Sequence, residues 1–314
     1  MPTVYAWGGP SGPPFSFTAL CDIVCLLERR DAMRVGIGIL MAAMLASCHG
    51  APAPAAQIEA DAGSSMPRGH AFDLTSARTG LEYVVLVSEP VDPLPAGAKA
   101  PVVYVTDGDW YFGMATDAVR QQKLQGAMGP TYVVAIAYAR ATSDMVYSRR
   151  EHELVHKPFK GENGVMGGGG EDFLLFVTEQ VRPLVEARFP IDKNRAVLAG
   201  QSLGGLFATN VLLSKPESFY GYLIGSPSLW ADPSLLAASR NFTRGEGHRV
   251  YVGVGGGESP PTRGYARSLA EALSARSTGL AVESAELARY SHMTMQGAWF
   301  AAGLRYLLPK AGAY

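Results

Sequence analysis

The segment 200–204 reads Gly-Gln-Ser-Leu-Gly, a G-x-S-x-G pattern with a hydroxyl at its centre. The preceding residues 195–199 are typical of a short buried strand, and residues 203–214 predict a helix. A serine in a sharp turn between strand and helix is raised above the sheet edge, and the first N–H groups of the helix face an oxyanion formed there. We therefore predict that Ser202 is a nucleophile and that the backbone N–H of Leu203 binds the oxyanion.

A serine nucleophile needs a base to take its proton and a carboxylate to orient that base. Where serine occupies such a turn, the acid and then the histidine follow it along the chain. His292 lies after the last predicted strand and before the last predicted helix, which makes it a better base than His248 at the start of a strand. Glu258 follows the strand predicted at 250–254 through a glycine-rich turn and is the predicted acid. Asp232, one connection earlier, remains the alternative acid.

The residues after the strand predicted at 101–106 are placed to complete this site. A loop after an early strand supplies the second oxyanion donor in such enzymes, and here we assign it to the backbone N–H of Asp109. Trp110 and Tyr111 follow directly, either as walls of the acyl pocket or as part of the core. Trp230, in the sequence Gly-Ser-Pro-Ser-Leu-Trp, is a further candidate for contact with the substrate.

A competing motif lies at 152–156, which reads His-Glu-Leu-Val-His. On a helix, His152 and His156 would share one face and bind zinc, with Glu153 as base and Glu171 as a third ligand. Such a site needs a rigid, packed helix, but Lys-Pro and several glycines follow directly. The segment is therefore predicted to be an exposed loop, with no metal or other cofactor, and a zinc metalloprotease remains the alternative function.

The N-terminal part predicts export. Residues 33–48 contain one arginine, a short apolar run and small residues that end in Cys48, as in a signal peptide with a lipoprotein cleavage site. Residues 1–32 fit no targeting pattern, which suggests that translation starts later. Residues 49–69 are rich in Ala, Pro, Gly and Ser and are typical of a linker. We expect lipidation of Cys48 and an exported, membrane-anchored protein of the cell envelope, with the outer membrane favoured because no aspartate follows the cysteine.

Composition limits the remaining possibilities. The 314 residues carry a net charge of −1 and are 47% hydrophobic, so no basic field for nucleic acid exists. All three cysteines lie at or before position 48, which leaves no disulfide framework for the body. The body, residues 70–314, has the length of one large α/β domain.

The body alternates strands and helices. After a hairpin at 70–90, strands are predicted at 101–106, 131–136, 195–199, 222–224, 250–254 and 281–287. Helices are predicted at 172–188, 203–214, 263–276 and 295–308. Strands separated by helices predict an α/β fold with a mostly parallel sheet and helices on both faces.

Several of these segments together resemble the α/β-hydrolase family of ferric-enterobactin-type siderophore esterases, which includes esterase D-like hydrolases. The matching segments are 103–112, 169–173, 199–208, 224–230 and 252–258. The resemblance implies the α/β-hydrolase fold and a metal-independent Ser-His-acid esterase, with Ser202, His292 and Glu258 in those roles. The family carries an Arg-x-Arg-Asp-type segment where this chain has Ser-Arg-Arg-Glu-His-Glu, and Arg149 or Arg150 is expected there to contact an anionic substrate.

Together, the residues and the resemblance predict a serine hydrolase that cleaves small-molecule carboxylic esters through an acyl-enzyme. An acyltransferase would use the same three side chains, with an alcohol in place of water. A ligand-binding lipoprotein without catalysis is a third alternative. The sequence predicts neither the identity of the ester nor an oligomeric state.

Overall fold

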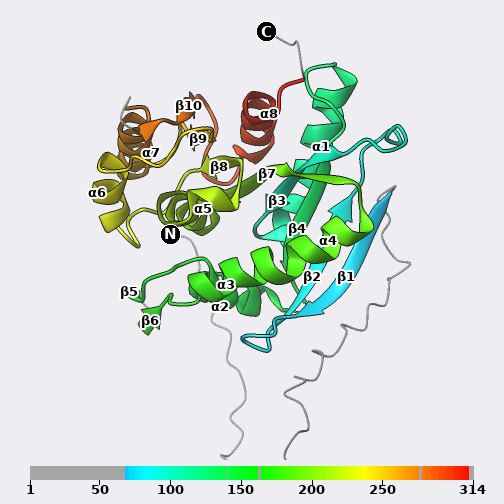
Figure 1. Cartoon of the computed structure of the whole chain (residues 1–314). Helices are drawn as coiled ribbons and strands as arrows, with labels where there is room; N and C mark the ends of the chain where they lie inside the picture. The colour runs from blue at the N-terminus through cyan, green and yellow to red at the C-terminus, as the bar shows by residue number, and fades with distance from the viewer. Residues whose placement is uncertain (1–67, 140, 162–163, 276–277, 311–314) are drawn as a thin grey trace, which may run out of the picture. The chain divides into compact units, whose positions relative to one another are not determined.

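A computed structural model describes residues 68–139, 141–161, 164–275 and 278–310. Eight strands form one sheet in the order β1-β2-β4-β3-β7-β8-β9-β10 (Figure 1). They are β1 (Gly69–Thr75), β2 (Glu82–Ser88), β3 (Ala100–Val105), β4 (Tyr132–Tyr138), β7 (Ile191–Gln201), β8 (Gly221–Gly225), β9 (Arg249–Gly255) and β10 (Ala281–Leu287). A separate two-stranded hairpin consists of β5 (Phe159–Gly161) and β6 (Gly164–Met166).

Six neighbouring strands, from β4 to β10 in the sheet order, run parallel, and β2 lies antiparallel between β1 and β4. We call the edge at which the six strands begin the amino edge and the edge at which they end the carboxyl edge. β4 and β8 are buried at every position, as expected for strands covered on both faces. The predicted α/β fold with a mostly parallel sheet is therefore confirmed.

Eight α-helices are described. They are α1 (Gly108–Leu124), α2 (Ser143–Glu153), α3 (Gly170–Phe176), α4 (Arg182–Arg188), α5 (Leu203–Ser214), α6 (Ser234–Arg240), α7 (Pro260–Leu273) and α8 (Gln296–Leu307). A π-helical turn at Val177–Val181 joins α3 to α4. None of these helices is long and apolar enough to cross a membrane.

The helices build two cores on opposite faces of the sheet. Alternate residues of β3 show the division, because Val102 and Tyr104 pack into the larger core, whereas Val103 and Val105 pack into the smaller one. The larger core contains residues of α3, α4, α5 and α7, and the smaller contains residues of α1 and α8. Both faces of the sheet are thus covered, and the loops at the carboxyl edge remain available for a site.

One predicted segment differs from expectation. The segment at 152–156 is only in part the predicted exposed loop, because α2 extends to Glu153, which is 2% exposed. Residues 154–156 lie outside the helix, but Leu154 and Val155 are buried. The inward face of α2 consists of Val146, Arg150 and Glu153. A helix with two charged residues of three on its buried face has no apolar periodicity, so its pattern indicated a loop.

The predicted signal peptide, Cys48 and most of the linker lie outside the described residues.

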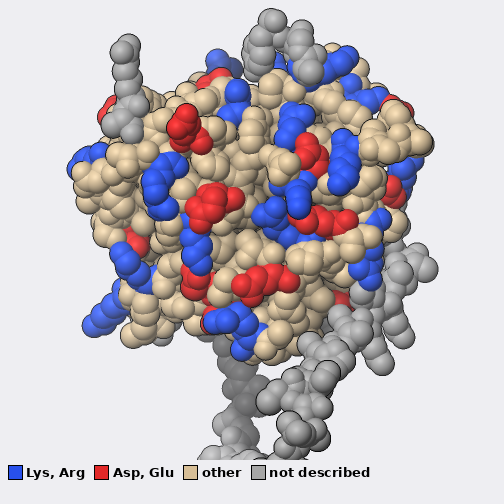
Figure 2. Space-filling model, viewed as in Figure 1, with Lys and Arg blue, Asp and Glu red and all other residues tan. Residues whose placement is uncertain are grey.

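Charged side chains are mixed on the surface. Figure 2 shows lysine, arginine, aspartate and glutamate interspersed over the face that it displays. This face presents no extended field of one sign, in agreement with the net charge of −1.

Candidate active site

Ser202 lies in the turn between β7 and α5, at the carboxyl edge. Its φ of 62° is in the left-handed region, which a residue with a side chain adopts only under strain. The glycines around it are required sterically. A Cβ on Gly200 would overlap the backbone of Gly204, and one on Gly205 would lie 2.6 Å from the carbonyl oxygen of Gly225. The close contact of strand and helix therefore raises the Ser202 hydroxyl at the end of the central strand.

His292 and Glu258 meet beside this turn. His292 Nδ1 lies 2.6 Å from Glu258 Oε2, and the glutamate side chain is 3% exposed. Ser226 Oγ donates to the other carboxylate oxygen at 2.5 Å, and the N–H of Gly255 donates to the same oxygen at 2.9 Å. Burial alone would raise the pKa of Glu258, but the hydrogen bonds from these three residues outweigh it and hold the pKa below its usual value. The carboxylate is therefore ionised at neutral pH and orients the imidazole.

The alternative acid, Asp232, has other partners. Its carboxylate accepts a hydrogen bond from the Ser234 hydroxyl at 2.5 Å and lies 3.4 Å from Lys157 Nζ. No hydrogen bond joins Asp232 to His292 in the described part of the chain. The structure thus brings Glu258, and not Asp232, to the histidine.

The hydrogen bonds of Ser202 Oγ and His292 Nε2 go to other side chains. Ser202 Oγ lies 3.3 Å from Ser228 Oγ, and His292 Nε2 lies 3.3 Å from the Gln201 amide nitrogen. Among the described residues, no hydrogen bond joins Ser202 Oγ to His292 directly. Contacts between nucleophile and base are often long in the absence of substrate and tighten when it binds.

Gln201 belongs to a buried chain of hydrogen bonds. Tyr111 Oη donates to Gln201 Oε1 at 2.8 Å, and Gln201 Nε2 donates to the carbonyl oxygen of His292 at 3.1 Å. The histidine loop is therefore tied to α1 through the residue that precedes the serine. Gln201, Ser226 and Ser228 were not predicted as site residues from the sequence, although each lies beside a predicted one in the segments 200–204 and 225–230.

The turn before α1 lies next to the start of α5. A Cβ on Gly204 would overlap Thr106 Oγ1 and would lie 3.3 Å from Asp107 Oδ2. Asp107 has a left-handed φ of 55°, and its carbonyl oxygen accepts the N–H groups of Trp110 and Tyr111. The structure thus brings the two predicted oxyanion donors, the N–H groups of Leu203 and Asp109, onto neighbouring helix starts.

The candidate substrate contacts divide into exposed and buried side chains. Trp230 is 56% exposed and packs edge-on against Phe159 of the β5–β6 hairpin, with ring centroids 5.7 Å apart. Trp110 packs against Tyr147, with centroids 5.3 Å apart. Tyr111 is only 5% exposed, so it belongs to the core rather than to a pocket wall.

Both arginines are occupied by partners within the chain. Arg149 donates to Glu153 Oε1 at 2.9 Å and to the carbonyl oxygen of Glu82 at 2.7 Å. Arg150 forms two hydrogen bonds with the carboxylate of Asp107, at 3.0 and 3.1 Å. This geometry gives no support to the predicted contact between either guanidinium and a substrate.

The His-Glu-Leu-Val-His segment forms no shared face for zinc, because α2 ends at Glu153. His152 Nδ1 contacts the carbonyl oxygen of Gly167 at 2.8 Å, and His156 stacks on Phe207 of α5. Within the described residues, no group of three or more His, Cys, Asp or Glu side chains is arranged to hold a metal ion. Glu171, the expected third ligand, pairs with Lys215 at 2.5 Å.

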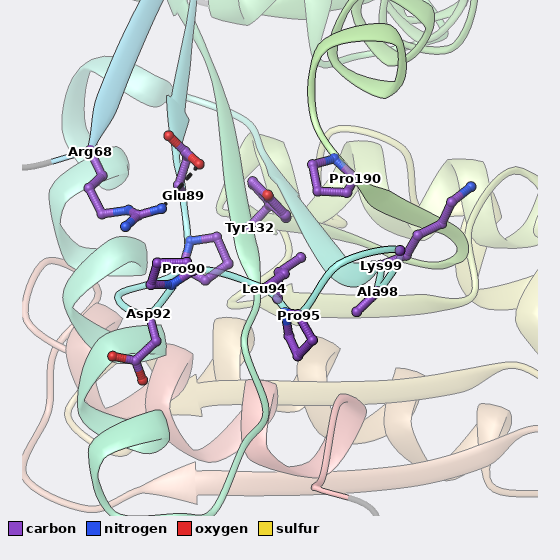
Figure 3. A pocket seen from close by; sticks show the side chains of 12 residues that line it. Arg68, Glu89, Pro90, Asp92, Leu94, Pro95, Ala98, Lys99, Tyr132 and Pro190 are labelled. Carbon is purple, nitrogen blue, oxygen red and sulfur yellow. Dashed lines mark hydrogen bonds and ion pairs between the residues drawn. The ribbon is translucent and has the colours of Figure 1, made fainter.

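A cavity of about 390 Å³ lies at the amino edge, away from Ser202. Figure 3 shows its lining, in which Lys99, Tyr132 and Pro190 directly precede or begin β3, β4 and β7. Because these strands start where the cavity lies and end at the proposed chemistry, the cavity is not part of the candidate active site.

A serine in the elbow of a parallel sheet, beside a paired histidine and carboxylate, defines a serine hydrolase of the α/β-hydrolase fold. The family described as "Putative esterase" matches residues 76–302. The chain belongs to this esterase family and is a carboxylic ester hydrolase of the siderophore-esterase type.

Individual relatives agree with this assignment. The ferri-bacillibactin esterase BesA of Bacillus subtilis is 30% identical over 77% of this chain and 90% of its own length. A siderophore enterobactin esterase of Emericella nidulans is 38% identical over 48% of this chain and 54% of its own. The crystal structure of BES protein from Bacillus cereus superposes with a TM-score of 0.69 and 26% identity, over 77% of this chain and 95% of that chain.

Proposed function

We propose that Ser202, His292 and Glu258 hydrolyse a siderophore-type ester through an acyl-enzyme. The observation that carries this proposal is the 2.6 Å contact between His292 Nδ1 and Glu258 Oε2, placed beside the left-handed turn that exposes Ser202. The contact fixes the tautomer in which Nδ1 carries the proton, so that Nε2 is unprotonated and can act as base.

The reaction then follows from the roles of these groups. Ser202 Oγ attacks the ester carbonyl while His292 Nε2 takes its proton, and the N–H groups of Leu203 and Asp109 stabilise the oxyanion. His292 returns the proton to the leaving alcohol. Water, deprotonated by the same imidazole, attacks the acyl-enzyme and releases the acid. Each oxyanion donor is worth about 3–4 kcal/mol in enzymes where one has been removed.

The substrate class is supported by the relatives. Three relatives carry names that describe esterases of ferri-bacillibactin, enterobactin and triacetylfusarinine C. We propose an ester of this kind, with Trp110 and the exposed Trp230 as apolar contacts at the mouth of the site. Aromatic side chains bury a large area against ligand rings, which suits a bulky substrate.

We also propose that the enzyme is exported and anchored by a lipid on Cys48. This rests on the sequence pattern of residues 33–48. Metabolic labelling with a lipid analogue, compared between the full chain and Cys48→Ala, tests the anchor.

The catalytic proposal is tested with the full-length protein, p-nitrophenyl butyrate and Ser202→Ala, each with and without EDTA. Ser214→Ala, at the exposed end of the same helix, is the matched control. We expect Ser202→Ala to abolish hydrolysis and also phosphonylation by a fluorophosphonate probe, in which Ser202 Oγ bonds to phosphorus and fluoride leaves, whereas Ser214→Ala and EDTA leave the rate unchanged. Activity that persists in Ser202→Ala and disappears with EDTA would overturn the mechanism.

The substrate proposal is tested separately with enterobactin and triacetylfusarinine C, each with and without Fe(III). Products are followed by mass spectrometry. We expect kcat/KM for at least one of these esters to exceed that for p-nitrophenyl butyrate. If the chromogenic ester is cleaved by Ser202 and neither siderophore is, the mechanism holds and the substrate class is wrong.

A further inference from the structure

A buried ion pair joins α2 to the turn that begins α1. The two nitrogens Nε and Nη2 of Arg150 donate to the two carboxylate oxygens of Asp107, at 3.0 and 3.1 Å. Arg150 is 7% exposed and Asp107 is 1% exposed. The removal of two charges from water is unfavourable, and their attraction compensates for it only when the geometry is good. A buried ion pair is therefore weak evidence for added stability, and its role is better sought in the backbone segment that it orients.

The pair holds a strained turn. Asp107 has a φ of 55°, which a residue with a Cβ keeps only when its surroundings impose it. Its carbonyl oxygen accepts the N–H groups of Trp110 and Tyr111, so the direction of the first turn of α1 depends on this one backbone conformation. The guanidinium of Arg150 also lies over the ring of Trp110, 5.0 Å from its centroid. One side chain therefore contacts the turn on both sides of Asp109.

The same turn is packed against the nucleophile. The N–H of Thr106 donates to the carbonyl oxygen of Ala199, the residue before Gly200 in β7. Asp107 Oδ2 would lie 3.3 Å from a Cβ on Gly204, the second residue of α5. A shift of Asp107 would therefore change the distance between the Asp109 N–H and the N–H of Leu203.

We propose that Arg150 is a positioning residue for oxyanion binding. It donates hydrogen bonds to both oxygens of the Asp107 carboxylate and thereby stabilises the left-handed turn. That turn orients the backbone N–H of Asp109 toward the place where negative charge develops. The proposal rests on the function proposed above. It gives the arginine a role through the turn rather than through contact with the substrate.

The neighbouring Arg149 provides a matched control. It lies on the same helix and also forms a largely buried ion pair, with Glu153. Its other contacts are the carbonyl oxygen of Glu82 and the rings of Tyr83 and Tyr138, all on the side of β2 and β4. It has no contact with Asp107. A loss that arises merely from weakening a buried ion pair in α2 should therefore appear in both arginine variants.

The test compares Arg150→Lys with Arg149→Lys in the full-length protein. Lysine keeps the charge but cannot form two parallel hydrogen bonds with a carboxylate. With p-nitrophenyl butyrate, we expect kcat of Arg150→Lys to fall by about 10- to 100-fold, with KM within about twofold, since a small misplacement of an oxyanion donor affects the transition state alone. Arg149→Lys should stay within about twofold in both constants.

Inhibition by phenylboronic acid gives a readout that a structural role would not change. Ser202 Oγ adds to the trigonal boron while His292 Nε2 takes the hydroxyl proton, and the tetrahedral boronate anion that results is stabilised by the oxyanion donors. We expect the inhibition constant to weaken in Arg150→Lys by about the factor lost in kcat, and to be unchanged in Arg149→Lys. Asp107→Asn keeps a residue that tolerates the left-handed conformation, and its combination with Arg150→Lys should be no worse than the more damaging single change.

Three results would overturn the proposal. The first is a raised KM with unchanged kcat in Arg150→Lys, which indicates direct substrate contact. The second is an equal loss in both arginine variants, which indicates a general effect on α2. The third is full additivity in the double variant. If Arg150→Lys fails to fold, as judged by circular dichroism, Asp107→Asn alone decides through the same kcat and boronate measurements. Failure of the catalytic proposal itself would appear differently, as activity in Ser202→Ala.

Discussion

The carboxyl and amino edges of the parallel sheet differ in backbone strain and in the burial of their polar contacts. Five non-glycine residues with positive φ occur in the described part of the chain, and four of them follow strands at the carboxyl edge. These four are Asp107 after β3, Ser202 after β7, Ser226 after β8 and Arg289 after β10. The amino edge instead carries a proline-rich loop, an open cavity and exposed ion pairs such as Arg68–Glu89 (Figure 3).

This contrast shows where the fold stores unfavourable free energy. A non-glycine residue in a sparsely populated backbone region costs about 1–3 kcal/mol, and it persists only when the surroundings determine it. At the carboxyl edge those surroundings are buried hydrogen bonds, such as Ser226 to Glu258 and Arg150 to Asp107. The carboxyl edge has four of the five strained residues and positions the reacting groups, whereas the amino edge has one, Arg68, and can change with little consequence.

The largest effect is expected at the carboxylate that orients the base. Glu258→Gln should lower kcat for p-nitrophenyl butyrate by about 10³- to 10⁴-fold, because the amide can no longer stabilise the imidazolium or enforce its tautomer. Asp232 is a buried carboxylate one connection earlier in the chain, and Asp232→Asn should retain most of the activity. If kcat fell as far in Asp232→Asn as in Glu258→Gln, the assignment of Glu258 as the acid would be wrong.

The second prediction concerns acid stability. Both ring nitrogens of His156 are buried and have no hydrogen-bond partner among the described residues, and burial lowers the pKa of this histidine from 6.5 to about 4. The unfolded chain therefore binds a proton at higher pH than the folded one. Stability is complete above pH 6.5 and falls as the pH decreases towards 4, by up to about 3 kcal/mol from this group.

His156→Phe keeps a ring against Phe207 and removes the titrating group. Urea unfolding at pH 7 and pH 4 should show a smaller difference in the free energy of unfolding for the variant than for the unmodified chain. If the difference in the free energy of unfolding between pH 7 and pH 4 were the same in His156→Phe as in the unmodified chain, the imidazole of His156 would be protonated in the folded state as readily as in the unfolded one.

The third prediction isolates strain from hydrogen bonding at Ser226, whose φ is 38°. Ser226→Ala and Ser226→Gly both remove the hydroxyl that donates to Glu258, and both should lower kcat by about tenfold, as expected for one charge-assisted hydrogen bond. Glycine tolerates the positive φ and alanine does not, so the glycine variant should be the more stable by about 1 kcal/mol. Equal stabilities in urea would show that the turn is not strained.

The sequence predicts the structure of the carboxyl edge only where neighbouring residues in the chain carry the pattern. The elbow at Ser202 was predictable because a buried strand, two glycines and a helix follow one another within a few residues. The pairing of His292 with Glu258 followed from the order of elements. Helix α2 was not predictable, because Arg150 and Glu153 occupy its buried face where apolar residues are expected.

Pairings between distant segments were beyond the reach of local patterns. Arg149 and Arg150 are neighbours in sequence, yet one binds Glu153 on its own helix and the other binds Asp107 across the carboxyl edge. From the sequence alone, a buried arginine with a partner inside the chain cannot be distinguished from an exposed arginine that binds a substrate. The hydroxyl of Ser226 likewise gains its role only when β8 places it against Glu258.

The smallest effect is expected at the amino edge. Glu89 pairs there with Arg68 at 3.4 Å and with His70 at 2.8 Å, and all three side chains are partly exposed. Exposed ion pairs contribute about 0–1 kcal/mol each, because water and salt screen them. Glu89→Gln should therefore change the free energy of unfolding by about 1 kcal/mol or less and kcat/KM by less than about twofold, measured with p-nitrophenyl butyrate. A loss of activity beyond about tenfold with an unchanged urea midpoint would mean that the cavity at this edge is coupled to Ser202, and the two edges would then not be independent.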